Sequence, residues 1–128
     1  MKVRAQVEGL GVPATIVTAN LAQDTALKIT ADRTVDKSTA ADDKIVGLLR
    51  VPARTANTQG TVETRFKALV EAECDGAIAA GDYVKAGAHN AGVQCFKKWT
   101  AGADDASLIL GQCWLGGADT ETGEFLIF

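Results

Sequence analysis

Apolar and charged residues alternate along residues 61–74, and this pattern limits the possible fold more than any other feature of the sequence. One side carries Val62, Thr64, Phe66, Ala68, Val70 and Ala72, and the other carries Glu63, Arg65, Lys67 and Glu71. Because successive side chains of a strand point to opposite faces, a period of two indicates a strand with one buried face. The pattern predicts that Phe66 lies in a core, and Leu69 is the one residue that departs from it.

The rest of the chain has the pattern of short strands separated by turn-forming residues. Further strands are expected over residues 1–7, 14–18, 25–30, 45–51, 83–85, 93–99, 107–115 and 124–128. Residues 9–13 are expected to interrupt the sheet, and residues 32–44 are expected to form a long exposed loop. Apart from a short helical turn over Ile78–Ala80, no helix is expected. The sequence shows no internal repeat.

These patterns predict an all-β fold in a single domain over residues 1–128. The expected architecture is a small β-sandwich or barrel, of the β-clip or β-tulip kind, with about eight or nine short strands and little or no helix. Aromatic residues make up 5% of the 128 residues, so the core is expected to be thin. A thin β core is often completed by neighbouring subunits, which favours oligomerisation.

Charge and hydropathy exclude several classes of partner. The net charge is −3, and the lysine and arginine residues are scattered, so the sequence lacks the basic patch that binds a phosphate backbone. No run approaches the ~20 apolar residues that a membrane-spanning helix needs, and residues 1–8 do not have the pattern of a secretory signal. We expect a soluble protein that is made in a reducing cytoplasm, with no nucleic acid and no membrane as direct partners.

The three cysteines, Cys74, Cys95 and Cys113, each lie in a strand-like run and form no Cys-x-x-Cys pair. A buried cysteine behaves as a small apolar residue, so all three are expected to be structural thiols. A metal or redox role is the less favoured alternative.

The sequence offers few groups that can converge into a catalytic site. His89 is the only histidine and lies in a turn, where a solvated side chain is the default expectation. A Cys-His pair would need a thiol that burial makes unreactive. The loop carboxylates occur as Asp42-Asp43, as Asp104-Asp105 and as the group Asp119, Glu121 and Glu124, and none has the alternating spacing of a calcium loop. We therefore expect no enzyme activity, no cofactor and no metal site.

The two tryptophans suggest a different kind of site. Trp99 follows Lys97 and Lys98 and is expected to be partly exposed, whereas Trp114 lies inside an apolar run and is expected in the core. An exposed tryptophan on a β surface is a weak sign of a carbohydrate-binding module.

Residues 21–128 resemble the small capsid decoration, or cement, proteins of tailed bacteriophages. The resemblance rests on four stretches in order, which are residues 20–28, residues 44–49, residues 60–68 and residues 77–85 followed by a glycine-bearing hairpin. A late Leu108-Ile-Leu-Gly-Gln-Cys-Trp114 run, an acidic loop and an apolar C-terminal strand complete the order.

This resemblance implies a compact β fold that forms homotrimers at three-fold positions of an assembled head and resists internal DNA pressure. It implies the major capsid protein as partner, the outer capsid surface of the virion as location and the host cytoplasm as the place of synthesis. It brings no catalytic or cofactor residue. Residues 1–12 are then an edge strand or an arm that contacts the capsid. The candidate capsid or subunit contacts are Met1, Val3, Val7, Leu10, Val12, Pro13 and Trp99.

Three alternatives stay open. One is a carbohydrate- or host-surface-binding β module on a phage particle, with Trp99 as its exposed aromatic residue. Another is a tail-tube or head-completion protein of similar size. The third is a small cysteine hydrolase that uses His89.

Overall fold

The computed structural model describes residues 1–7, 9–64 and 67–127, which form eleven strands and one 3₁₀ turn. The strands are β1 (Lys2–Val7), β2 (Leu10–Ile16), β3 (Ala26–Ala31), β4 (Thr34–Lys37), β5 (Ile45–Leu49), β6 (Thr58–Thr64), β7 (Lys67–Cys74), β8 (Tyr83–Ala86), β9 (Cys95–Lys98), β10 (Gly111–Leu115) and β11 (Thr122–Ile127). The 3₁₀ turn η1 spans Ala106–Leu108. The all-β prediction is confirmed, with more strands than expected.

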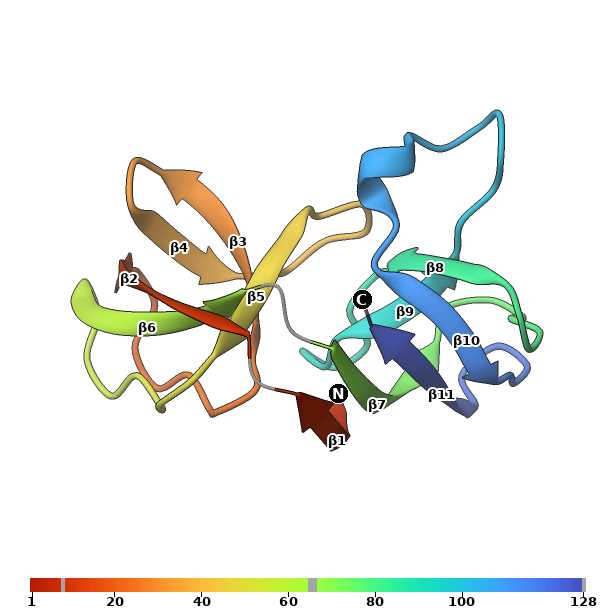
Figure 1. Cartoon of the computed structure of the whole chain (residues 1–128), viewed down its shortest axis with the longest axis horizontal. Coiled ribbons are helices and arrows are strands. Elements are labelled where there is room, and N and C mark those ends of the chain that lie inside the picture. Colours follow the sequence, from red (N-terminus) through yellow and green to blue (C-terminus); the bar gives the residue numbers. More distant parts are fainter. Residues whose placement is uncertain (8, 65–66, 128) are drawn as a thin grey trace.

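Two small closed barrels lie side by side and account for ten of these strands (Figure 1). The first, here called the N barrel, contains β2 to β6 in the order β2-β4-β3-β5-β6. The second, the C barrel, contains β7 to β11 in the order β7-β11-β10-β8-β9, and a β7–β9 pairing closes it. Of the two predicted architectures, the barrel is therefore observed.

The two barrels have the same topology. In each, the first strand pairs in parallel with the third, as β2 with β4 and β7 with β9, and pairs antiparallel with the fifth. The second strand pairs with the third and the fourth, and the fourth pairs with the fifth. The chain thus folds one five-strand pattern twice, although its sequence shows no repeat by inspection.

Hydrogen bonds outside the strands repeat as well. In the N barrel, Leu21 and Ala53 exchange two backbone hydrogen bonds of 2.9 Å, and in the C barrel Ile78 and Gly117 exchange two of 3.0 Å. Three residues after Leu21 and Ile78, the chain adopts a positive φ, at Asp24 and Gly81. Asp24 N–H donates to the carbonyl of Leu49, and Gly81 N–H donates to that of Cys113.

A long antiparallel ribbon joins the barrels. β1 pairs with β7, and β2 pairs with β6. Val7 lies opposite Lys67, and three residues further along Leu10 lies opposite Thr64, so one register continues through both ladders. β1 therefore belongs to the edge of the C barrel although the chain then passes directly into the N barrel.

Each barrel has its own core, and the cores differ in composition. The N barrel core is aliphatic and consists of Ala14, Ile16, Leu21, Leu27, Val35, Leu49, Ala53 and Val62. The C barrel core contains the edge-to-face pair Phe96 and Phe125, with ring centroids 4.9 Å apart, together with Cys74 and Cys113. Cys95 is also buried in this barrel. Ala26 and Leu48 come from the N barrel but pack in the C barrel core. The junction is therefore an apolar contact.

Several sequence expectations need correction. Residues 10–13 do not interrupt the sheet, because Leu10–Ile16 is one strand. Pro13 is tolerated in it because its missing N–H faces the edge of β2 that no described residue pairs with at this position. Thr34–Lys37 forms β4 inside the segment that was expected to be a loop. No helical turn forms over Ile78–Ala80, whereas η1 forms at residues 106–108.

The predicted strand over residues 61–74 corresponds to β6 and β7. Ala68, Val70, Ala72 and Cys74 are buried and alternate with more exposed residues, which confirms the predicted period. Phe66 and the side chain of Val7 lie outside the described part of the chain. Glu63 was expected on the polar face, but it is buried because the Gly9 N–H (2.8 Å) and Arg50 (3.0 Å) satisfy its carboxylate.

Candidate functional site

The three thiols are buried in the C barrel and are not poised for chemistry. Cys74, Cys95 and Cys113 are all free thiols that lie in strands. Burial raises the pKa of each, and it raises that of Cys113 to about 11. A thiol with a raised pKa carries little thiolate at neutral pH and is a poor nucleophile. The prediction of structural thiols agrees with this geometry.

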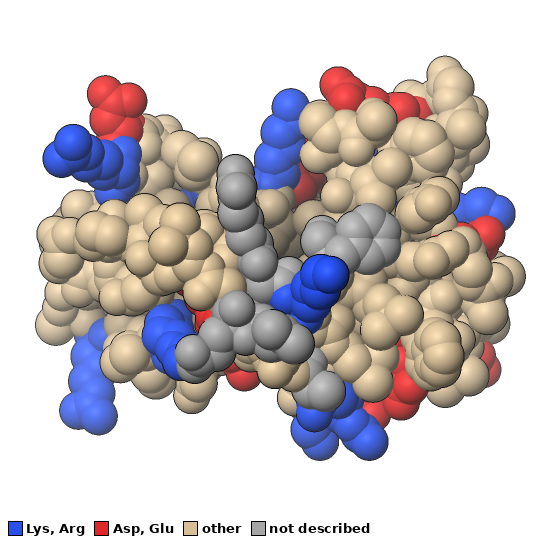
Figure 2. Space-filling model, in the orientation of Figure 1, with Lys and Arg blue, Asp and Glu red and all other residues tan. Residues whose placement is uncertain are grey.

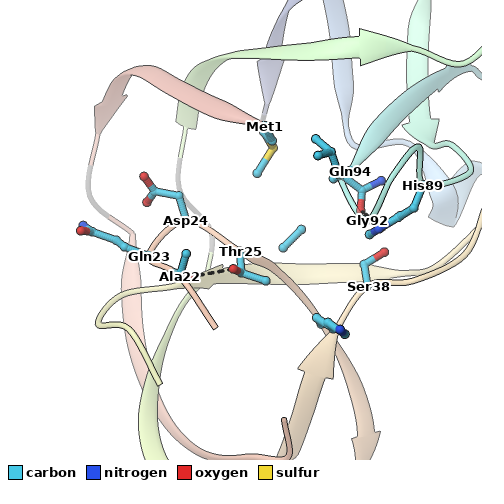
Figure 3. Close-up of a pocket in the computed structure, with 12 residues that line it drawn as sticks. Met1, Ala22, Gln23, Asp24, Thr25, Ser38, His89, Gly92 and Gln94 are labelled. Carbon is cyan, nitrogen blue, oxygen red and sulfur yellow. Dashed lines mark hydrogen bonds between the residues drawn. The ribbon is translucent and has the colours of Figure 1, made fainter. Parts of the chain in front are cut away.

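His89 lies at the edge of a cleft between the two barrels. Its Nε2 is 2.9 Å from Oε1 of Gln94. The cleft has a volume of about 230 Å³ and is lined by Met1, Ala22–Ala26, Lys37, Ser38, His89 and Gly92–Gln94. In Figure 3, His89 and Gln94 lie on the C barrel side and Ala22 to Thr25 lie across from them. Asp24 also lines this cleft, and burial, followed by the nearby Glu63 carboxylate, raises its pKa.

The acidic loop residues act as acceptors that hold turns in place. Asp119 Oδ1 accepts from Gly76 N–H, Glu121 Oε2 accepts from Ala118 N–H, and Asp82 Oδ2 accepts from Ala79 N–H, each at 2.8–3.0 Å. Within residues 1–7, 9–64 and 67–127, no group of three or more histidine, cysteine, aspartate or glutamate side chains is placed to hold a metal ion. Over the same residues, no helix is long and apolar enough to span a membrane.

A lysine–aspartate pair occurs at the same place in each barrel. In the N barrel, Lys28 Nζ lies 3.1 Å from Asp43, whose Oδ2 also accepts from Thr39 N–H at 2.8 Å. In the C barrel, Lys85 Nζ lies 2.6 Å from Asp104, whose Oδ2 accepts from Thr100 N–H at 2.7 Å. Each aspartate therefore joins the end of one strand to the lysine of another.

Lys85 has a second partner that links the barrels. Its side chain is 7% exposed, and Asp42 of the N barrel lies 2.7 Å from its Nζ. Asp42 N–H also donates to the carbonyl of Ala86 at 3.1 Å. The hydrogen bonds that Lys85 donates to Asp104 and then to Asp42 raise its pKa, so the buried ammonium stays charged. This contact and the shared apolar core hold the two barrels in one arrangement.

The predicted contact residues fall into three environments. Leu10 is 60% exposed, Val12 is 37% exposed and Pro13 is exposed, all on the first half of β2. Met1 and Val3 are half-buried and pack against the C barrel core. Trp99 is half-buried: its Nε1 donates to the carbonyl of Asp105 at 3.0 Å, and its ring meets Tyr83 edge-on. Leu10, Val12 and Pro13 lie on one strand, with Leu10 and Val12 on one face and Pro13 on the other, and Trp99 lies in the other barrel.

The exposed surface around β2 and β6 carries few charges and combines the apolar Leu10 and Val12 with the polar Gln59 and Thr61. In Figure 2, much of the surface over β2 and β6 in the left lobe is free of lysine, arginine, aspartate and glutamate. Pro13, Gly11 and Val12 add no charge to it.

The expectation for Trp114 was wrong. Trp114 is 63% exposed on the outside of β10, next to Leu115, whereas Cys113 points into the core. Tyr83 lies opposite Gln112 of the same strand and is also exposed. An apolar run is fully buried only where both faces of a sheet are covered. The outer face of β10 is open, so the apolar run around Trp114 did not predict burial of its side chain.

Sequence analysis also missed the repeated lysine–aspartate pairs. A signal was present in the sequence, because Thr39-Ala40 precedes Asp43 by the same spacing as Thr100-Ala101 precedes Asp104. Lys28 and Lys85 likewise end two similar runs, residues 21–28 and residues 78–85. The spacing between these matches changes along the chain, from 57 residues at the lysines to 61 at the aspartates, so a fixed period is absent.

Comparison with known proteins gives a fold likeness but no family. No protein-family model matches the sequence, and no curated protein matches it. The N base of the head fiber gp8.5 in bacteriophage phi29 has a similar structure, with a TM-score of 0.54 and 15% sequence identity. The match covers 97% of this chain and 95% of that chain, so the likeness includes both barrels.

Proposed function

We propose that this chain is a structural protein of a phage head. It binds the major capsid protein on the outer surface of the assembled shell, at three-fold positions, and stabilises the shell against internal DNA pressure. The observation that supports this most is the fold likeness to a head fiber base over nearly the full length of both chains. The ordered sequence stretches that resemble decoration proteins support it independently.

The physical design of the molecule suits a passive brace. Two closed barrels leave few unpaired strand edges, and the Lys85 contacts and the shared core fix one barrel on the other. The described residues hold no convergent catalytic set, since the thiols are buried and the carboxylates cap turns. A brace needs a rigid body and a contact surface, and the exposed Leu10, Val12 and Pro13 supply a candidate surface.

A homotrimer is part of the proposal. Three linked copies on one three-fold position raise the effective concentration of each contact, so individually weak contacts give stable attachment. Light scattering of the free protein and of the protein released from capsids measures this directly. Monomers in both samples would contradict the trimer and leave capsid attachment standing.

Binding to capsids tests the function itself. The purified chain is mixed with expanded and with immature capsids of its phage, sedimented and quantified, and the particles are reconstructed. We expect saturable, stoichiometric binding to expanded capsids and retention of DNA to higher temperature. If neither kind of capsid binds the chain, the proposal fails. Density at a head vertex or within the tail would instead indicate a head-completion or tail-tube protein.

A second candidate function follows from Trp114. Its 63% exposure on the outer face of β10, with the exposed Tyr83 paired to Gln112 two residues away, favours the stacking of a sugar ring in a carbohydrate-binding role. Titration with neutral oligosaccharides such as cellohexaose and chitohexaose, read by tryptophan emission in the wild type and in Trp114→Ala, tests this role. Quenching that Trp114→Ala abolishes supports it, and unchanged emission in the wild type contradicts it.

A further inference from the structure

The common topology of the barrels places β2 and β7 in equivalent positions. Ile16 pairs with Val35 of β4, and Cys74 pairs with Phe96 of β9, as the second pair of the parallel ladder in each barrel. Counting back from these two residues, Val12 corresponds to Val70 and Leu10 corresponds to Ala68. The opposite edges also correspond, because β6 and β11 pair along β2 and β7.

One edge differs between the two strands. On β7, the edge that pairs with β9 at Glu73 and Cys74 continues into a ladder with β1 over Lys67–Glu71. On β2, the same edge pairs with β4 at Thr15 and Ile16, and no described residue pairs with it over Leu10–Pro13. The strand position that β1 fills in the C barrel is therefore empty in the N barrel.

The side chains show the same difference. Ala68 is 5% exposed and Val70 is fully buried, with Val3 of β1 and the preceding Met1 packed against their core cluster. Leu10 and Val12 have the same inward parity as the buried Ala14 and Ile16, yet they are 60% and 37% exposed. Two apolar side chains that point to the inner face thus lack the cover that their counterparts have.

The backbone at this edge is suited to pairing. Thr15 N–H donates to Arg33 and Val17 N–H donates to Val35, so the odd-numbered residues of β2 present their backbone groups to this side. Continuing the alternation, Gly11 presents an N–H and a C=O, and Pro13 presents a C=O without an N–H. Gly9 N–H is already bound by Glu63. The free edge is short and ends at Pro13.

We propose that an extended segment of the shell protein adds to β2 as an antiparallel strand over Leu10–Pro13 and covers Leu10 and Val12. This inference rests on the proposed function and names its contact. By analogy with β1, the added segment carries apolar residues at alternate positions, as Met1 and Val3 do, and it exchanges two hydrogen bonds with Gly11. The added strand occupies the place on β2 that β1 occupies on β7.

A second copy of this chain is the less suitable occupant. If two copies paired through the same edge, each would bring a Pro13 that lacks an N–H, and the shared ladder would lose donors from both strands. The chain's own β1 is already paired with β7. Continuity with the β1 ladder and the open Gly11 groups therefore favour a strand from a different protein.

Gly11→Pro and Gly11→Ala provide a matched test. Gly11→Pro removes the N–H that the added strand needs. It breaks no hydrogen bond between the described residues, because the odd-numbered residues of β2 turn their N–H groups to the β4 side and the even-numbered ones face β6. Gly11→Ala adds a Cβ at the same place, 3.2 Å from Thr61 Cγ2, and keeps the N–H. We expect Gly11→Pro to lower capsid affinity at least tenfold and Gly11→Ala to stay within about threefold of the wild type.

Side chains and amide exchange complete the experiment. Leu10→Ser with Val12→Ser should lower capsid affinity at least tenfold, and Ile29→Ser, on an exposed residue of β3, should not. The Gly11 amide should exchange at least tenfold more slowly on the capsid. If the wild type binds and Gly11→Pro binds equally well with the Gly11 amide unprotected, strand addition is wrong and the proposed function stands. If the wild type binds no capsid, both fail.

Discussion

The N barrel and the C barrel share one topology and one set of turn hydrogen bonds, but their cores differ in composition and in how they are covered. The C barrel packs Phe96 on Phe125 and gains Met1 and Val3 from β1 as well as Ala26 and Leu48 from its neighbour. The N barrel has an aliphatic core without an aromatic residue, and its β2 edge is open. β7 therefore has a strand on each edge, whereas no described residue pairs with the outer edge of β2 over Leu10–Pro13.

This difference assigns different tasks to the two halves. A complete barrel with covered edges is a stable platform, because its apolar groups are already removed from water. A closed barrel with an unpaired β2 edge and two exposed inward-facing residues still has apolar surface that binding would bury.

The largest effect should come from the aromatic core of the C barrel. Val35 and Phe96 occupy equivalent positions, each opposite the last residue of the first strand's parallel ladder. Phe96→Ala should lower the free energy of unfolding by about 3–5 kcal/mol, because it leaves a large cavity beside Phe125. Val35→Ala should cost about 2 kcal/mol, from roughly 0.8 kcal/mol per buried methylene and a small cavity.

Denaturant titration of both variants measures these values. If Val35→Ala costs as much as Phe96→Ala, the cores are equally important and the comparison of platform and contact barrel is wrong. Because all three cysteines lie in the C barrel, thiol labelling during the titration reports separately on its opening.

The next effect should come from the lysine that joins the barrels. Lys85→Met leaves the carboxylates of Asp42 and Asp104 without their buried counter-charge and should cost about 2–4 kcal/mol. Lys28→Met, the equivalent change in the N barrel, should cost about 1 kcal/mol, since Lys28 is more exposed and has one acidic partner. Equal losses in unfolding free energy would show that the contact between Lys85 and Asp42 adds no stability beyond that of the Lys85–Asp104 pair within the C barrel.

Asp43 should make the stability of the N barrel depend on pH. Burial on its own would raise the pKa of Asp43, but hydrogen bonds from Ala40, Thr39, Lys28 and Ser38 outweigh it and lower the pKa to about 2. Because the folded pKa lies below the unfolded value of 3.8, the stabilisation is fully present above about pH 5 and is lost as pH falls toward 2.

The loss should amount to about 2 kcal/mol, by linkage at 1.36 kcal/mol per pKa unit. Asp43→Asn should remove this part of the acid dependence and flatten the curve of unfolding free energy against pH between 5 and 2. An unchanged slope in Asp43→Asn would place the acid sensitivity elsewhere, and Asp104, whose pKa is also lowered, first by Lys85, is the equivalent group to test next.

Local pattern was sufficient for the strands and insufficient for their closure. Alternation correctly identified the inner face of β7, because its even-numbered residues from Ala68 to Cys74 are apolar and all buried. Barrel closure depends on parallel pairs such as Ile16 with Val35, which lie 19 residues apart and leave no periodic trace. Trp114 and Glu63 were misjudged for a related reason, since their exposure depends on partners that are distant in the sequence. The candidate contacts Leu10, Val12 and Pro13 came from a segment that the resemblance did not cover, and they stay a prediction.

The smallest effect on unfolding free energy is expected at Val12, and comparing it with Val70 tests whether the β2 edge is open. Val12 and Val70 are the same residue type at equivalent positions, so the difference between them measures what an edge strand contributes. Val70→Ala should cost about 2 kcal/mol because Val70 is fully buried beneath β1. Val12→Ala should change the unfolding free energy of the free chain by less than about 0.5 kcal/mol, as is usual for an exposed position. If a strand of the shell protein covers Val12, the same substitution should weaken capsid binding although it leaves folding unchanged. A large loss of stability from Val12→Ala in the free chain would mean that Val12 is already covered, and the N barrel would then be as complete as the C barrel.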